Sequence, residues 1–104
     1  MRADLLRGHL DGLLLAVLAE APGHGYELSQ RLTRRTGGEL AVHEGSLYPA
    51  LHRLEGGGLV ESSWSVGEGR RRRIYRLTSA GRRAVKESRR EWRVFSAAVD
   101  RVLG

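Results

Sequence analysis

The segment EGSLYPALHRLEGGGL at residues 44–59, followed by SSWSVGEGRRRRIYRLTSAG at residues 62–81, decides the fold. Its first part has leucines at helical spacing and a triple glycine that ends the helix. Its second part predicts strands over 59–64 and 72–77, joined by a glycine-containing tip that leads into four consecutive arginines. Because a single helix fits the major groove of DNA, a helix beside a basic hairpin predicts a winged helix–turn–helix.

Helical periodicity predicts three further helices, over residues 5–20, 24–36 and 78–103, with Thr78 as the N-cap of the last. A short strand is expected over residues 40–42. The predicted fold is therefore mainly α with a small β-hairpin, a winged helix–turn–helix plus a long C-terminal helix.

The helix after residue 43 must accommodate Pro49, which is tolerated best in a first helical turn. Ser46 is the expected N-cap on that ground, although the chain can also begin to wind at Glu44. Its inner face is expected to carry Leu47, Leu51 and Leu54.

Length and composition exclude several classes of protein. The 104 residues suit one domain, and the absence of cysteine excludes disulfides and thiolate zinc sites. The longest apolar run, Leu13 to Ala19, is far shorter than the ~20 residues of a membrane helix. We therefore expect a soluble cytoplasmic protein. The four histidines show no metal-ligand spacing, so no enzyme, cofactor or metal is expected.

The net charge of +6 is concentrated in the C-terminal third. Residues 1–69 hold six arginines and nine acidic residues, a net −3, whereas residues 70–104 hold twelve basic and three acidic residues, a net +9. This polarity favours a polyanionic partner, and arginine suits bidentate phosphate recognition, although a solubilising surface is the simpler alternative.

The expected DNA-binding residues lie in two groups. One is the outward face and flank of the helix after residue 43, and the other is the arginine cluster where the hairpin returns, here called the wing. They are Ser46, Tyr48, Pro49, His52, Arg53, Arg70, Arg71, Arg72 and Arg73. Strand alternation separates the four wing arginines onto two faces, and pairing with Glu61 or Glu68 is an alternative for some. Trp64 and Tyr75 are expected to pack in the core.

Three blocks resemble the PadR family of bacterial transcriptional regulators: GHGYELSQRL at 23–32, GGELAVHEGSLYPALHRLEGGGLVESSW at 37–64 and GRRRRIYRLTSAGRRAV at 69–85. The resemblance implies a winged helix–turn–helix whose recognition helix spans 46–55 and whose wing is the hairpin tip over residues 65–73. It also implies that Tyr48 contacts phosphate, and that Ser46 and Pro49 lie at the groove.

The last helix carries apolar residues that repeat every seven positions, which is the pattern of paired helices. A second copy of the chain is therefore expected to cover this stripe, although folding back onto the first helix is an alternative. The expected interface consists of Leu6, Leu10, Val85, Trp92, Phe95, Val99 and Val102. The resemblance agrees with dimerisation through this helix and implies that a planar aromatic effector can stack on Trp92. Plain core packing by Trp92 is the alternative.

These observations predict a DNA-binding domain over residues 1–77 and a dimerisation helix over residues 78–104. The expected function is a homodimeric repressor that binds double-stranded DNA at a palindromic operator, relieved by a small aromatic ligand. A winged-helix module that binds protein without specific DNA binding is the main rival, because fold does not fix function. Duplex RNA is a weaker rival, because its deep, narrow major groove excludes a helix.

Overall fold

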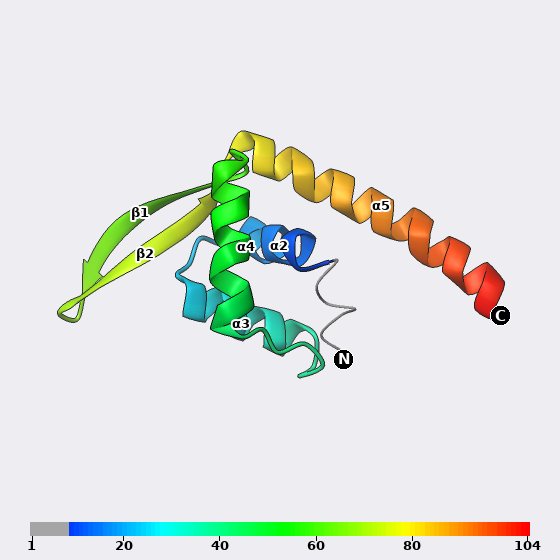
Figure 1. Cartoon of the computed structure of the whole chain (residues 1–104), viewed down its shortest axis with the longest axis horizontal. Helices are drawn as coiled ribbons and strands as arrows, with labels where there is room; N and C mark the ends of the chain where they lie inside the picture. Colours follow the sequence, from blue (N-terminus) through cyan, green and yellow to red (C-terminus); the bar gives the residue numbers. More distant parts are fainter. Residues whose placement is uncertain (1–8) are drawn as a thin grey trace.

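The computed structural model of the chain describes residues 9–104, which form four helices and one β-hairpin. In chain order these are α2 (Leu10–Glu20), α3 (Gly25–Arg35), α4 (Glu44–Gly56), β1 (Val60–Gly67), β2 (Arg70–Leu77) and α5 (Ser79–Leu103). The hairpin and α5 extend from the helical body in different directions (Figure 1), so the molecule measures 54 × 28 × 20 Å.

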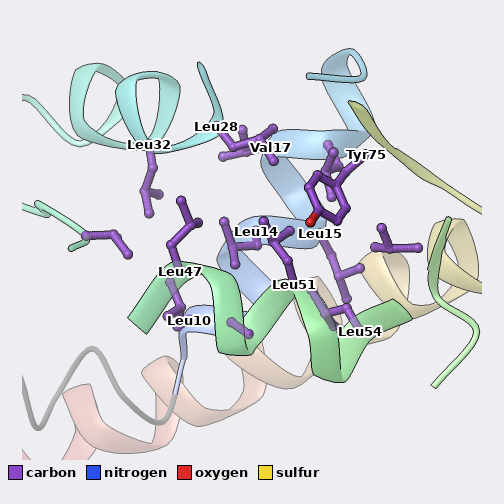
Figure 2. Close-up of a cluster of buried hydrophobic side chains, with 14 of the residues drawn as sticks. Leu10, Leu14, Leu15, Val17, Leu28, Leu32, Leu47, Leu51, Leu54 and Tyr75 are labelled. Carbon is purple, nitrogen blue, oxygen red and sulfur yellow. The ribbon is translucent and has the colours of Figure 1, made fainter. Parts of the chain in front are cut away.

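The core lies where α2, α3 and α4 meet the base of the hairpin, and Figure 2 shows their side chains converging. Leu14, Leu28 and Leu51, one from each of these helices, are 0% exposed. Fully burying a leucine contributes about 1.5–3 kcal/mol, so this leucine cluster dominates the stability of the fold. The predicted inner face of α4 is confirmed.

Two helix starts follow directly from side-chain chemistry. His24 caps α3, because its Nδ1 accepts a hydrogen bond from the Glu27 backbone N–H at 3.3 Å. The Glu27 carboxylate in turn accepts one from the His24 backbone N–H at 3.1 Å. Thr78 caps α5 as predicted, since its Oγ1 accepts from the Gly81 backbone N–H at 3.0 Å.

The start of α4 differs from the Ser46 cap expected from sequence. The helix begins at Glu44 with His43 at the N-cap position, as the alternative allowed, and Pro49 is its sixth residue. Pro49 therefore removes a helical hydrogen bond to the carbonyl of Gly45. Gly45 is exposed, so water can solvate that carbonyl and the helix continues.

The hairpin is longer than predicted, because the strands run to Gly67 and from Arg70. The two turn residues, Glu68 and Gly69, have φ of 52° and 76°, and positive φ at both positions is what a type I′ hairpin turn requires. The register places Trp64 opposite Arg73 and Val66 opposite Arg71.

The strand expected over residues 40–42 does not form. Leu40 and Val42 are buried and Ala41 is exposed, so the alternation that suggested a strand is real. The free edge of β2 is instead bridged by Gly23, which exchanges backbone hydrogen bonds with Tyr75 at 3.1 and 2.9 Å. Residues 40–42 therefore contribute the side chains of Leu40 and Val42 to the core without joining the sheet.

Only the beginning of α5 packs on the body. Val85 is buried in the core, whereas Trp92 and Phe95 are 53% and 54% exposed. At ~1.5 Å per residue the helix is ~37 Å long, and its C-terminal half projects past the body (Figure 1). Within residues 9–104, no helix is both long and apolar enough to cross a membrane.

Candidate nucleic-acid interface

The outer face of α4 is exposed as the sequence predicts. Leu47, Ala50, Leu51 and Leu54 fix the helix to the core through its other face. The residues left in solvent on the outer side are Ser46, Pro49, His52 and Arg53, with Tyr48 at the flank. Short polar groups and a proline ring on an exposed helix allow close approach to base edges and thymine methyls in a major groove.

Tyr48 is held against the first residue of α3, a contact that was not anticipated from the sequence. A Cβ placed on Gly25 would lie 2.7 Å from the Tyr48 Oη and 2.8 Å from its Cζ, so only glycine admits the ring there. Tyr48 itself is 39% exposed. Gly25 is the first residue of the helix, and no turn requires a glycine there. Its presence is therefore the sequence signal that could have indicated this contact.

Hydrogen-bonding side chains from β2, α4 and the start of α3 meet at this corner. Arg72 from the wing lies with Nη1 3.0 Å from Nε2 of His24, the residue that caps α3. The Tyr48 hydroxyl lies beside the next residue, Gly25. The Arg72 guanidinium and the partial positive charge of the helix start favour an anionic oxygen at this corner, whereas the Glu27 carboxylate, 3.3 Å from Nε2 of His24, opposes it.

Arg53 is attached to α2 rather than free. Its Nη2 donates to the Asp11 carboxylate at 2.8 Å, and its Nε lies 3.5 Å from the same group. This hydrogen bond and the charge of Asp11 raise the pKa of Arg53. Both side chains are about half exposed and solvent screens the pair, so a DNA phosphate can compete with Asp11 for this guanidinium.

The four wing arginines have different surroundings, and strand alternation separates them as predicted. Arg71 and Arg73 share a face with Trp64, and their guanidinium carbons lie 4.5 and 5.2 Å from its ring centroid. Arg73 approaches Glu55, with Nη2 4.0 Å from the carboxylate, instead of Glu61 or Glu68. Arg70 is exposed at the turn.

Trp64 corrects an expectation of core packing. Trp64 is 55% exposed because β1 has already left the helical body at this point, whereas Tyr75 on the facing strand is 4% exposed as expected. Tyr26 is 64% exposed and stacks on His24 with ring centroids 6.4 Å apart. Strand alternation predicts the face on which a side chain lies, but not whether that part of the strand lies against the core. This second property makes Trp64 exposed and Tyr75 buried.

The expected dimer interface divides into buried and exposed members. Leu10 and Val85 are 4% and 3% exposed within the single chain, so they leave almost no surface for a partner. Their side chains are used where α2 packs on the start of α5. Leu6 lies outside the described residues. The exposed or partly exposed members are Trp92, Phe95, Val99 and Val102.

Trp92 begins this exposed stripe. The centroid of its ring lies 5.4 Å from that of His9, edge-on, and 5.9 Å from that of Phe95.

Within residues 9–104, no three His, Cys, Asp or Glu side chains form a cluster that could hold a metal ion.

Comparison with known proteins agrees with the geometry. Residues 14–87 match the model of the Transcriptional regulator PadR-like family. An uncharacterized protein from Lysinibacillus sphaericus is 35% identical over 101 residues, which is 96% of this chain and 93% of that protein. A transcriptional regulator, Rv3488, from Mycobacterium tuberculosis is 51% identical over 67 residues, which is 64% of this chain and 60% of that protein.

Solved structures share the whole architecture. A transcriptional regulator from Clostridium thermocellum has a TM-score of 0.90 at 30% identity, covering 98% of this chain and all of that one. A PadR-family regulator from Eggerthella lenta has a TM-score of 0.84 at 35% identity, covering 96% and 86%. The chain therefore belongs to the PadR-like family of transcriptional regulators, which are not enzymes, and it has the winged-helix fold with which such regulators bind DNA.

Proposed function

We propose that this chain is a homodimeric repressor that recognises a palindromic operator through α4 and holds the DNA backbone with its wing. The observation that carries the proposal is the two-sided character of α4. One face is fixed in the core by leucines, while the other presents exposed groups beside an arginine-bearing hairpin. Residues 1–77 would form the DNA-binding part and residues 78–104 the dimerisation helix.

Roles within the interface follow from the surroundings of each residue. Ser46, Pro49 and His52 would meet base edges, because they lie on the exposed face of α4. Tyr48 and Arg53 would contact phosphates at the two flanks of the helix. Arg70, Arg71, Arg72 and Arg73 supply the positive charge of the wing. If three or four phosphates are neutralised per chain, the logarithm of the binding constant should fall against that of salt with a slope of roughly −3 to −4.

Binding by three variants tests this assignment. Tyr48→Phe should weaken binding about equally on all duplexes, since a phosphate contact carries no sequence information. Ser46→Ala and His52→Ala should instead change the preference at particular bases, which a randomised duplex library would reveal. If all three variants bind with unchanged affinity and preference, α4 is not the recognition helix.

The dimer is inferred from the exposed stripe on α5. Trp92 and Phe95 are large apolar groups more than half exposed, and Val102 is 85% exposed. A contiguous apolar stripe of this kind is an aggregation hazard unless a second surface covers it. A two-fold dimer would place two recognition helices about 34 Å apart, one turn of DNA.

Sedimentation equilibrium tests the dimer. Phe95→Glu should give a monomer, whereas Val94→Glu changes an exposed valine that lies off the seven-residue repeat and should leave a dimer. A monomeric wild-type protein, or equal dissociation of the two variants, would contradict the proposed interface.

The effector proposal rests on Trp92. Its exposed ring lies on the stripe where two copies would meet, so a planar aromatic compound could stack between them. Such a ligand relieves repression only if it binds the DNA-competent and incompetent dimers with different affinity. In Trp64→Phe protein the tryptophan emission reports on Trp92 alone, and a library of planar aromatics that never quenches it would contradict the proposal.

A further inference from the structure

A continuous set of side-chain contacts connects the end of the recognition helix to the wing. It starts at Glu55, the second-last residue of α4. Glu55 Oε2 accepts a hydrogen bond from the Ser62 hydroxyl at 2.6 Å, and the Ser62 oxygen accepts one from Nε of Arg73 at 2.8 Å. Arg73 then lies over the ring of Trp64 at 5.2 Å, and Arg71 lies over the same ring at 4.5 Å.

The hairpin register explains why these groups meet. Ser62 and Trp64 are two residues apart on β1, and Arg71 and Arg73 are two residues apart on β2, so all four lie on one face. Trp64 faces Arg73 directly and Arg71 diagonally, and both positions are within reach of an indole ring. The other two wing arginines, Arg70 and Arg72, lie on the opposite face.

Burial shows that this indole does not serve the core. Trp64 is 55% exposed, and the guanidinium groups of Arg71 and Arg73 lie over its ring. Leaving a large apolar side chain in water on a projecting hairpin calls for a reason other than packing. Stacking on an indole uses the flat face of a guanidinium and leaves its N–H groups, which lie in the plane, free to donate.

We propose that Trp64 is a positioning residue for DNA binding, which holds Arg71 with its N–H edge available to a phosphate. Arg73 serves mainly as the link between Trp64 and the recognition helix, because its Nε is already bonded to Ser62. The hydrogen bonds from Glu55 through Ser62 to Arg73 fix the orientation of the wing relative to the recognition helix. The contact with Trp64 partly orders Arg71 before DNA binds. This inference deepens the proposed function and rests on it.

Binding to a labelled duplex of fixed, arbitrary sequence tests the role, because phosphate contacts need no operator. Trp64→Ala should weaken binding about two- to fivefold, the range for an exposed cation–π contact, while Trp64→Phe retains most of the affinity. Ser63→Ala is the matched control, since Ser63 is the exposed neighbour of Trp64 on β1 but lies on the opposite face of the hairpin, away from Arg71 and Arg73. It should bind as the wild type does.

A double-mutant cycle separates positioning from a contact of Trp64 with DNA. If Trp64 acts through Arg71, the double variant Trp64→Ala/Arg71→Ala should bind no more weakly than Arg71→Ala alone. Losses that multiply, or a Ser63→Ala loss equal to that of Trp64→Ala, would overturn the proposal.

The free protein supplies a readout that does not depend on DNA. The Arg71 side-chain protons should show upfield ring-current shifts in the NMR spectrum, lost in Trp64→Ala and largely kept in Trp64→Phe. Absence of these shifts in the wild type would refute the stacking while leaving DNA binding intact. Their presence in a protein that binds no duplex would instead refute the proposed function.

Discussion

Replacing Gly25 by alanine should displace Tyr48 without unfolding the protein. The added Cβ would lie 2.7 Å from Oη and 2.8 Å from Cε1 and Cζ of the phenol. Ordinary contacts between such atoms are about 3.5–4.0 Å, so the ring must move by roughly 1 Å. Tyr48 can make this movement because its side chain is 39% exposed and rotates into solvent.

The expected loss is one hydrogen bond from a phenol to a charged phosphate oxygen. Such bonds contribute about 1.5–3 kcal/mol, which corresponds to roughly 10- to 150-fold weaker binding for each recognition helix. Stability should change little. Alanine is the better helix former by up to about 1 kcal/mol, which offsets the cost of rotating the ring.

Fluorescence anisotropy with a labelled duplex and urea unfolding would measure the two quantities. Gly56→Ala is the control, since a Cβ there meets nothing within 4 Å. The variant Gly25→Ala/Tyr48→Phe should bind no more weakly than Gly25→Ala, because both changes remove the same contact. Unchanged affinity in Gly25→Ala, or losses that multiply in the double variant, would refute the role given to Tyr48.

Three further predictions concern stability. In Gly81→Ala the new Cβ would lie 2.0 Å from the Leu59 carbonyl oxygen, which belongs to the backbone, so we expect a loss of about 1–3 kcal/mol or more in urea unfolding. Gly12→Ala, whose Cβ would meet Ser88 at 3.4 Å, is the tolerated comparison, and equal effects would contradict the argument. Thr78→Ala removes the cap of α5 and should lower the free energy of unfolding by about 1 kcal/mol, or a melting temperature by about 4–8 °C. Burial raises the pKa of Tyr75, so the unfolded chain ionises first as the pH rises above about 10. Stability should fall there, and less steeply in Tyr75→Phe; parallel pH profiles would contradict this.

Sequence periodicity predicted the elements that have one buried face and one exposed face. The leucines of α4 and the threonine cap of α5 are local signals, and the structure confirms them. The strand expected over 40–42 was wrong because alternation shows only which side chains face the core. Whether a strand forms depends on an available sheet edge, and Gly23 occupies that edge.

Contacts between distant segments were beyond sequence reasoning. Nothing local to Trp64 indicates that β1 has left the core at that residue, so packing was expected where exposure is found. The contact between Gly25 and Tyr48 joins two helices and depends on how closely they approach. The residues expected to bind DNA do lie on exposed or partly exposed surface, because amphipathic helices and strand alternation already separate inner from outer positions.

Selection of bound duplexes from fragments of the source genome, with purified protein and excess non-specific competitor, tests the central claim most directly. The account predicts recovery of a small set of fragments that share a two-fold-symmetric motif, with half-sites about one helical turn apart. Retention only at low salt, with no shared motif, would contradict it. The basic wing would then bind phosphates without recognition by α4, and a protein partner would become the better explanation of the fold.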